Sequence, residues 1–184
     1  RRLPRQTDHS EFSPSCSRDG RFLAYVSWDD RLMGRVRVLD LQRGTETVLT
    51  PEPGKYLSPR FSPDGRQIAF SASYDGNTDV YVIGVDGGDA KRLTWHPAPD
   101  TVNGWSPDGQ RVLFASPREV LNNRSNQLFE VSVKGGFEQR LMAAVAFEGA
   151  WSPDGRQLAY RPYNAAYSGP SGWRQSRGGS TPPV

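Results

Sequence analysis

The stretch GAWSPDGRQLAY at residues 149–160 identifies the fold, because it is one of four copies of a single pattern. The other copies are FSPSCSRDGRFLAY at 12–25, RFSPDGRQIAF at 60–70 and GWSPDGQRVLF at 104–114. The aspartates that they share, Asp19, Asp64, Asp108 and Asp154, are 45, 44 and 46 residues apart. A repeat of about 40–45 residues has the length of one four-stranded propeller blade.

Each copy predicts a β-hairpin. Pro sets φ for position i+1 of a type I turn, Asp suits i+2, and Gly takes the left-handed conformation, which gives a three-residue loop with a bulge. After the turn Ile68 and Phe70 share one face while Gln67 and Ala69 share the other, which is the period of a strand. The turn residues are therefore interpreted as structural: Ser62, Pro63, Asp64, Gly65, Ser106, Pro107, Asp108, Gly109, Ser152, Pro153, Asp154 and Gly155.

The rest of each period supplies two more strands. The segments RVRVLDLQRGTETVLT (35–50), DVYVIGVDGGDAKRLT (79–94) and NQLFEVSVKGGFEQRL (126–141) each combine a β-branched run, a turn sequence and a short outer strand. The first copy differs, because Arg18 replaces Pro and extra residues stand before its turn. A type I turn tolerates this replacement, so a hairpin is still expected there.

The predicted fold is all-β, a partial β-propeller of about four blades of four antiparallel strands over residues 1–184. We expect residues 1–10 to form an outer strand of a preceding blade, because RRLP resembles KRLT at 91–94. Blades follow at 11–50, 51–94 and 95–141, with an incomplete blade at 142–184. The chain begins without Met and ends without a terminating pattern, so we expect a piece of a longer protein, poorly stable or self-associating on its own through open sheet edges.

The composition argues against several classes of protein. The net charge of +3 comes from scattered residues, so no nucleic-acid footprint is predicted, and the lone Cys16 excludes an internal disulfide. No apolar run is long enough to span a membrane, and no signal peptide is visible. With only His9 and His96 and no G-x-S-x-G elbow, a catalytic triad cannot be assembled. No metal or other cofactor is predicted, since DGNTD at 75–79 lacks the rest of a calcium loop.

The segment SRGGS at 176–180 has two interpretations. Its backbone N–H groups could hold an anion, with Arg174 or Arg177 adding positive charge. Alternatively, Gly178 and Gly179 permit a loop that packs Trp173 against the propeller.

The repeat resembles the TolB-like, PD40-type propeller repeats. Three later segments, at 92–119, 126–141 and 172–184 (GWRQSRGGSTPPV), together resemble the amino-terminal propeller of tricorn-type serine peptidases. The resemblance covers essentially the whole chain, and its RGG element is the most discriminating part.

This resemblance implies a six-bladed propeller whose axial channel passes short peptides, within a peptidase whose PDZ domain and catalytic serine lie beyond this segment. It implies a channel role for Trp173, Arg174, Arg177, Gly178 and Gly179, and no catalytic residue among the 184. Peptides and the other domains of the parent chain would be its partners, in a homo-oligomeric full-length protein located in the cytoplasm or the periplasm. The family's type member holds the substrate carboxy terminus with two arginines before the third hairpin, whereas HPAPDTVNG at 96–104 has none.

Two functions from different classes follow. The first is a non-catalytic propeller that gates or channels oligopeptides to or from a downstream serine-peptidase core. The second is a TolB-like protein-binding module without enzymatic activity, which the repeat alone supports equally well.

Overall fold

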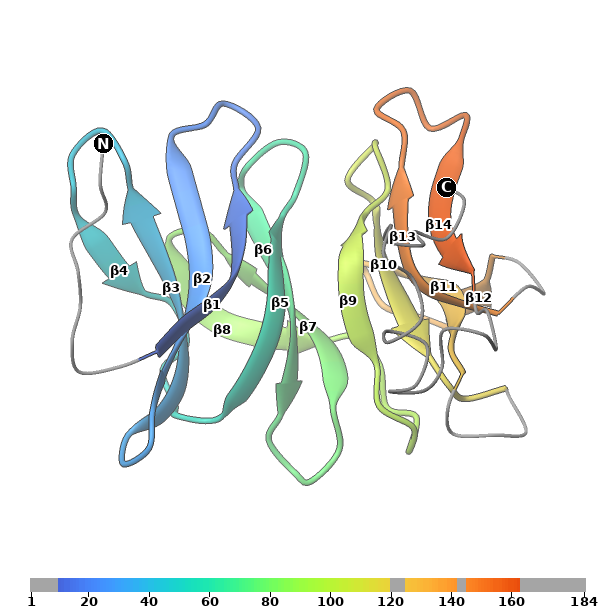
Figure 1. Cartoon of the computed structure of the whole chain (residues 1–184), viewed down its shortest axis with the longest axis horizontal. Coiled ribbons are helices and arrows are strands. Elements are labelled where there is room, and N and C mark those ends of the chain that lie inside the picture. The colour runs from blue at the N-terminus through green and yellow to red at the C-terminus, as the bar shows by residue number, and fades with distance from the viewer. Residues whose placement is uncertain (1–9, 120–124, 142–144, 163–184) are drawn as a thin grey trace, which may run out of the picture.

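The computed structural model describes residues 10–119, 125–141 and 145–162. These residues form fourteen strands and no helix, arranged as four antiparallel sheets that stand side by side (Figure 1). Within each sheet the strands follow one another in sequence order. The predicted all-β partial propeller is confirmed, and we refer to the four sheets as blades 1 to 4.

Blades 1 to 3 have four strands each, and two strands of blade 4 lie within the described residues. Blade 1 comprises β1 (Ser10–Cys16), β2 (Phe22–Asp29), β3 (Met33–Asp40) and β4 (Glu46–Val48). Blade 2 comprises β5 (Lys55–Phe61), β6 (Gln67–Ser73), β7 (Asp79–Gly84) and β8 (Gly87–Arg92). Blade 3 comprises β9 (Thr101–Trp105), β10 (Arg111–Ser116), β11 (Gln127–Ser132) and β12 (Gln139–Arg140), and blade 4 comprises β13 (Ala146–Trp151) and β14 (Leu158–Pro162). The outer strand expected at residues 1–10 falls outside the described residues, apart from Ser10.

The Ser-Pro-Asp-Gly turns join the first two strands of each blade. In blade 2 the Ser62 amide donates to the Gln67 carbonyl at 2.8 Å and the Gly65 amide to the Ser62 carbonyl at 2.9 Å, with Gly65 at φ +71°. The loop thus has four residues, 63–66, one more than the expected three. The reason is that the Ser62 hydroxyl, and not its carbonyl, accepts the Gln67 amide at 3.0 Å, while it donates to Asp64 at 2.6 Å.

The first repeat closes in the same way. Ser17 Oγ donates to Asp19 at 2.5 Å and accepts from the Phe22 amide at 2.9 Å, so Arg18 does not disturb the turn. The expectation of extra residues before this turn was wrong. The shift in strand register between Phe12 and Ser15 has an equivalent in every blade, so it is a β-bulge common to all four first strands.

Apolar cores lie between neighbouring blades. Ile68 and Phe70 on one face of β6 pack toward blade 1, whereas Ala69 on the other face packs toward blade 3. Cross-strand aromatic pairs form the centre of two of these contacts: the rings of Phe70 and Tyr81 stack at 5.9 Å and those of Phe114 and Phe129 at 5.7 Å. The period-two alternation therefore distributes large and small side chains between the two faces of each blade.

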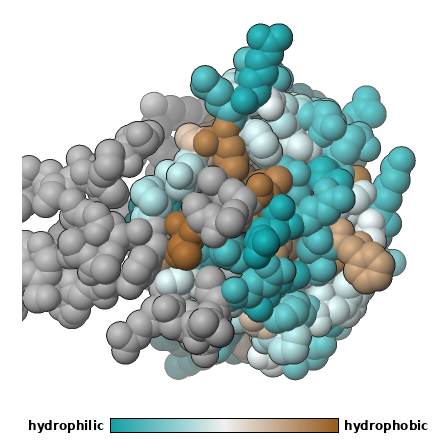
Figure 2. Space-filling view, turned by 90° about the vertical axis from the view of Figure 1, so that its right-hand side faces the viewer, coloured by the Kyte–Doolittle hydropathy of each residue, from teal (hydrophilic) through white to brown (hydrophobic). Residues whose placement is uncertain are grey.

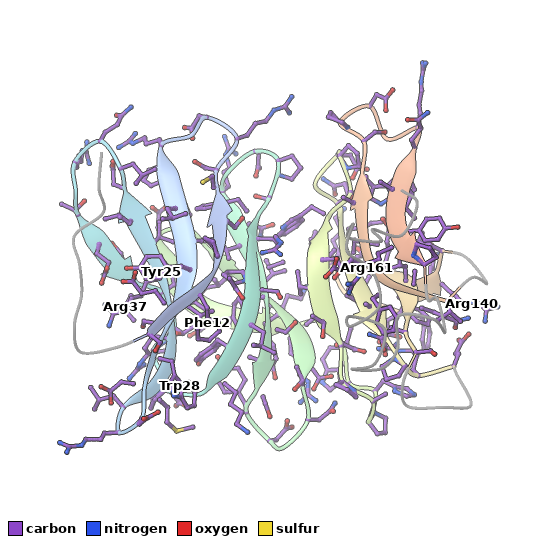
Figure 3. All side chains as sticks on the ribbon, in the orientation of Figure 1. Phe12, Tyr25, Trp28, Arg37, Arg140 and Arg161 are labelled. Carbon is purple, nitrogen blue, oxygen red and sulfur yellow. The ribbon has the colours of Figure 1, made fainter. Side chains whose placement is uncertain are left out.

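The outward face of blade 1 has polar contacts at the positions where the faces between blades have stacked aromatic rings. The cross-strand pair equivalent to Phe70–Tyr81 is Tyr25–Arg37, labelled in Figure 3. Both side chains bond to Glu46, and Arg37 also donates to Ser27 at 2.7 Å. This end of the array therefore presents hydrogen-bonding groups where an interior blade presents a stacked ring pair.

The outward side of blade 4 is mixed in character. Arg161 pairs with Glu148 at 3.4 Å and lies over the Phe147 ring at 5.5 Å. From this end, hydrophobic residues form small separate areas among hydrophilic ones (Figure 2).

Replacing Gly34 by Ala is expected to destabilise the chain by about 1–3 kcal/mol. Gly34 and Gly54 exchange two backbone hydrogen bonds, of 3.0 and 3.1 Å, which tie the β2–β3 hairpin to the connection between blades 1 and 2. A Cβ at Gly34 would stand 2.5 Å from the Gly54 carbonyl oxygen, so the backbone must move. Urea unfolding compared with Gly104→Ala, whose added Cβ meets no atom within 4 Å, tests this; equal midpoints for both variants would contradict it.

Candidate functional site

The first strands of the four blades, β1, β5, β9 and β13, form the inner wall of the array (Figure 1). Each lies at an end of its own sheet, and β1, β5 and β9 each contact the first strand of the next blade. In a propeller the innermost strands surround a central channel. The residues on these strands are therefore the candidate site for a molecule that moves along the axis.

Arg60 on β5 connects two neighbouring inner strands. Its Nε donates to the Asn103 carbonyl on β9 at 3.2 Å, and the Trp105 indole on β9 donates back to the Arg60 carbonyl at 2.9 Å. Side chains thus satisfy backbone groups at strand edges that have no ladder partner.

Arg60 also interacts with a blade that is not its neighbour. Burial lowers the pKa of the Arg60 guanidinium, and the Glu148 carboxylate on β13 opposes this shift. Glu148 belongs to blade 4, so its charge reaches Arg60 past the whole of blade 3. Glu148 is thus near enough to Arg60 for their charges to interact, although its direct ion-pair partner is Arg161 at 3.4 Å.

Two further groups complete the lining. The Asn103 side-chain nitrogen is buried and has no hydrogen-bond partner within the part of the chain that the structure describes. Leu57 on β5 is 42% exposed. A guanidinium, a carboxylate and an apolar side chain can bind the termini and side chains of a peptide, but they supply no nucleophile with a neighbouring base.

Arg60 is the functional candidate that the sequence did not reveal. The stretch 96–104 contains no arginine, yet its Asn103 contacts the arginine of the preceding blade. The available signal was the alignment of the repeats: the position before the last strand residue holds Arg60 in blade 2 and the small residues Ser15, Gly104 and Ala150 elsewhere.

The Ser and Asp of the repeated turns bond to each other and to the backbone. In each turn the Ser hydroxyl lowers the pKa of the Asp, and a backbone amide adds to this shift; the four carboxyls are Asp19, Asp64, Asp108 and Asp154. His96 is the one histidine among the described residues, and its Nδ1 accepts the Ala98 amide at 3.0 Å. The hydrogen bonds of the Ser and Asp side chains thus remain within each turn.

No group of three or more potential metal ligands occurs in the described ranges 10–119, 125–141 and 145–162. In the stretch DGNTD, Asp75 and Asp79 instead bond to Arg92 at 2.9 and 2.6 Å. The channel candidates Trp173, Arg174, Arg177, Gly178 and Gly179 lie outside the described residues. The described part of the chain contains no helix that is long and apolar enough to cross a membrane.

Acid is expected to weaken the turns. The folded-state pKa of each turn Asp is lowered, so its contribution to stability is complete above the unfolded-state pKa of about 3.9 and is lost as the pH falls through the folded-state value. Asp64→Asn/Asp108→Asn keeps a side-chain acceptor in two turns but removes the titration. Between about pH 5 and pH 3 the urea midpoint of the unmodified chain should fall further than that of the double variant; parallel losses would contradict this.

One protein-family model matches the sequence of this chain. The model described as the tricorn protease N-terminal beta propeller domain matches residues 32–184.

Relatives of two kinds are also similar in sequence. The Tol-Pal system protein TolB of Francisella tularensis subsp. mediasiatica is 33% identical over 171 residues, which is 90% of this chain and 38% of that protein. Tricorn protease homolog 1 of Streptomyces coelicolor is 30% identical over 167 residues, 88% of this chain and 14% of that protein.

A solved structure, that of TolB from Acinetobacter baumannii, matches 84% of this chain and 38% of its own, with a TM-score of 0.69 and 29% identity. The chain thus spans well under half the length of each of these relatives.

Proposed function

The chain belongs to the family of tricorn protease N-terminal beta propeller domains, and from this premise we propose that it gates or channels oligopeptides in a tricorn-like peptidase. In this proposal the segment does no chemistry itself, the complete propeller has six blades, and a downstream serine-peptidase core cleaves the peptide. The observation that carries the proposal is the inner wall, where Arg60 of blade 2 bonds to Asn103 of blade 3 and senses the charge of Glu148 in blade 4.

Each lining residue has a distinct task in the proposal. The Arg60 guanidinium stays charged at physiological pH and pairs with the carboxy terminus of a peptide in the channel. The Asn103 carbonyl accepts a hydrogen bond from Arg60 Nε at 3.2 Å and so holds the guanidinium at the inner wall. The exposed Leu57 contacts apolar side chains, and the width between the inner strands excludes folded proteins.

The parent protein provides the test. It should hydrolyse short chromogenic peptides, and mutation of a serine downstream of this segment should abolish the activity. Arg60→Gln should lower kcat/KM for peptides with a free carboxy terminus by about tenfold, the value of one charged hydrogen bond, and leave amidated peptides unaffected. Equal losses on both peptide types would rule out the role of Arg60, and a parent protein without hydrolytic activity would overturn the peptidase function.

The second candidate is a TolB-like protein-binding module. It is supported by the 33% identity to TolB over 90% of this chain, which is at least as strong as the similarity to the tricorn homologue. The downstream reading frame separates the two functions, because only the first requires a peptidase core after the propeller.

A further inference from the structure

The loops opposite the Ser-Asp turns form one continuous surface. This loop face consists of residues 29–34, 50–55, 74–79 and 94–100, and its β2–β3 and β6–β7 loops project from the lower side in Figure 1. Backbone bonds between Gly34 and Gly54 join its first two segments. Its last two are joined by the Asp100 amide, which donates to the Thr78 carbonyl at 2.8 Å, and by the Asn77 side chain, which donates to the His96 carbonyl at 2.5 Å.

Four of the seven large exposed apolar side chains of the described residues belong to the loop face. It carries Leu32, Met33, Tyr74 and Trp95, which are 72, 41, 41 and 61% exposed. The other large exposed apolar residues of the described chain are Val48 on β4, Leu57 on β5 and Phe137 before β12, each on a different element. A cluster of such side chains is typical of an interaction surface, and Trp and Tyr are the residue types that contribute most to binding energy.

Around Arg92 the loop face carries more carboxylates than cations. Its guanidinium bonds to Asp79 at 2.6 Å and to Asp75 at 2.9 Å, so one cation serves two carboxylates. Asp79 is fully buried, whereas the Asp75 side chain is 58% exposed. The exposed carboxylate therefore retains the capacity to pair with a second cation.

Two aromatic residues belong to the same part of the loop face as this carboxylate. Tyr74 precedes Asp75 in the chain, and the Trp95 ring lies 5.8 Å from the Arg92 guanidinium that binds Asp75. Tyr74 is fixed in place, because its hydroxyl is hydrogen-bonded to the Tyr56 hydroxyl at 3.0 Å and its ring meets Tyr81 edge to face at 5.0 Å. A partner that binds here orders little of this surface, which lowers the entropic cost of binding.

We propose that the loop face binds an extended cationic segment of a partner protein. An arginine or lysine of that segment pairs with Asp75 and lies against the rings of Tyr74 and Trp95, where a cation is attracted to the ring faces. Apolar residues that flank it contact Leu32 and Met33. The inference goes beyond the axial channel and requires no peptidase core, so either proposal can fail without the other.

Fluorescence anisotropy with a labelled, capped peptide of three Gly-Arg-Leu repeats tests the proposal on this chain. The peptide should bind, and a matched peptide of Gly-Glu-Leu repeats should not. Trp95→Ala and Asp75→Asn should each weaken binding by about tenfold, and Asp75→Lys should abolish it. Phe137→Ala is the matched control, because it removes a 95% exposed ring at a distant turn and should leave the affinity unchanged.

Three results would contradict the proposal. Equal binding of the two peptides would show that charge does not select the partner. Loss of affinity in Phe137→Ala as large as in Trp95→Ala would show non-specific binding to exposed rings. Full affinity in both Trp95→Ala and Asp75→Lys would place the peptide elsewhere. Any of these results overturns the proposal, while thermal melts of the variants separate loss of binding from loss of folding.

Discussion

Replacing Phe114 by Ala is expected to lower the free energy of unfolding by about 3–5 kcal/mol, because it leaves a cavity between two blades. Phe114 is fully buried, stacks on Phe129 at 5.7 Å and belongs to the core that joins blades 2 and 3. It also lies 5.1 Å from the Arg118 guanidinium, so the substitution removes a cation–π contact as well.

Urea unfolding followed by tryptophan fluorescence measures the effect. The control is Phe137→Ala, which removes the same number of atoms from a 95% exposed side chain and should shift the unfolding free energy by less than about 0.5 kcal/mol. Similar shifts in the two variants would mean that blades 2 and 3 do not share a packed core.

Arg118→Met is expected to cost about 3–5 kcal/mol, because it leaves a buried carboxylate without its partner. Arg118 Nη2 bonds to Asp100 at 2.6 Å; the two side chains are 6% and 0% exposed. The second Asp100 oxygen already has no hydrogen-bond partner within the described residues. Burial raises the pKa of Asp100, and Arg118 acts against that shift.

A double variant distinguishes the lost charge from the lost packing. Asp100→Asn/Arg118→Met removes both charges, so most of the stability lost in the single variant should return. The single variant should also recover stability as the pH falls, because its Asp100 has a raised folded-state pKa and protonation removes the unpaired charge. A double variant as unstable as Arg118→Met, with no dependence on pH, would contradict this.

The local pattern of the sequence was sufficient to predict the blades. The Ser-Pro-Asp-Gly turns and the alternation of Ile68, Ala69 and Phe70 depend on residues that are neighbours in the chain, so their effect can be read directly. The four-residue loop was missed because the Ser62 side chain replaces a backbone acceptor. The bulge in the first strands was not predicted, because Ser13-Pro14 in β1 and Ser58-Pro59 in β5 resemble turn sequences.

The candidate site was harder to predict, because its residues meet only after the blades pack. Arg60 contacts Asn103 in the next blade, and the charge of Glu148, two blades away, acts on the pKa of Arg60. Asp75 in DGNTD pairs with Arg92, which stands seventeen positions later in the sequence. The contacts of Arg60 depend on how the blades pack and the Asp75–Arg92 pair on the pairing of β7 with β8, so no local period in the sequence encodes them.

The most direct test of peptide selection at the inner wall is a comparison of long and short substrates with the parent protein. Leu57→Trp places a larger side chain on β5, and Val48→Trp makes the same change on the outer strand β4, where the original side chain is similarly exposed (42% and 45%). The measured quantity is the ratio of kcat/KM for a long peptide to that for a tetrapeptide. We predict that Leu57→Trp lowers this ratio severalfold and that Val48→Trp leaves it unchanged; the same ratio in both variants would contradict a channel lined by β5.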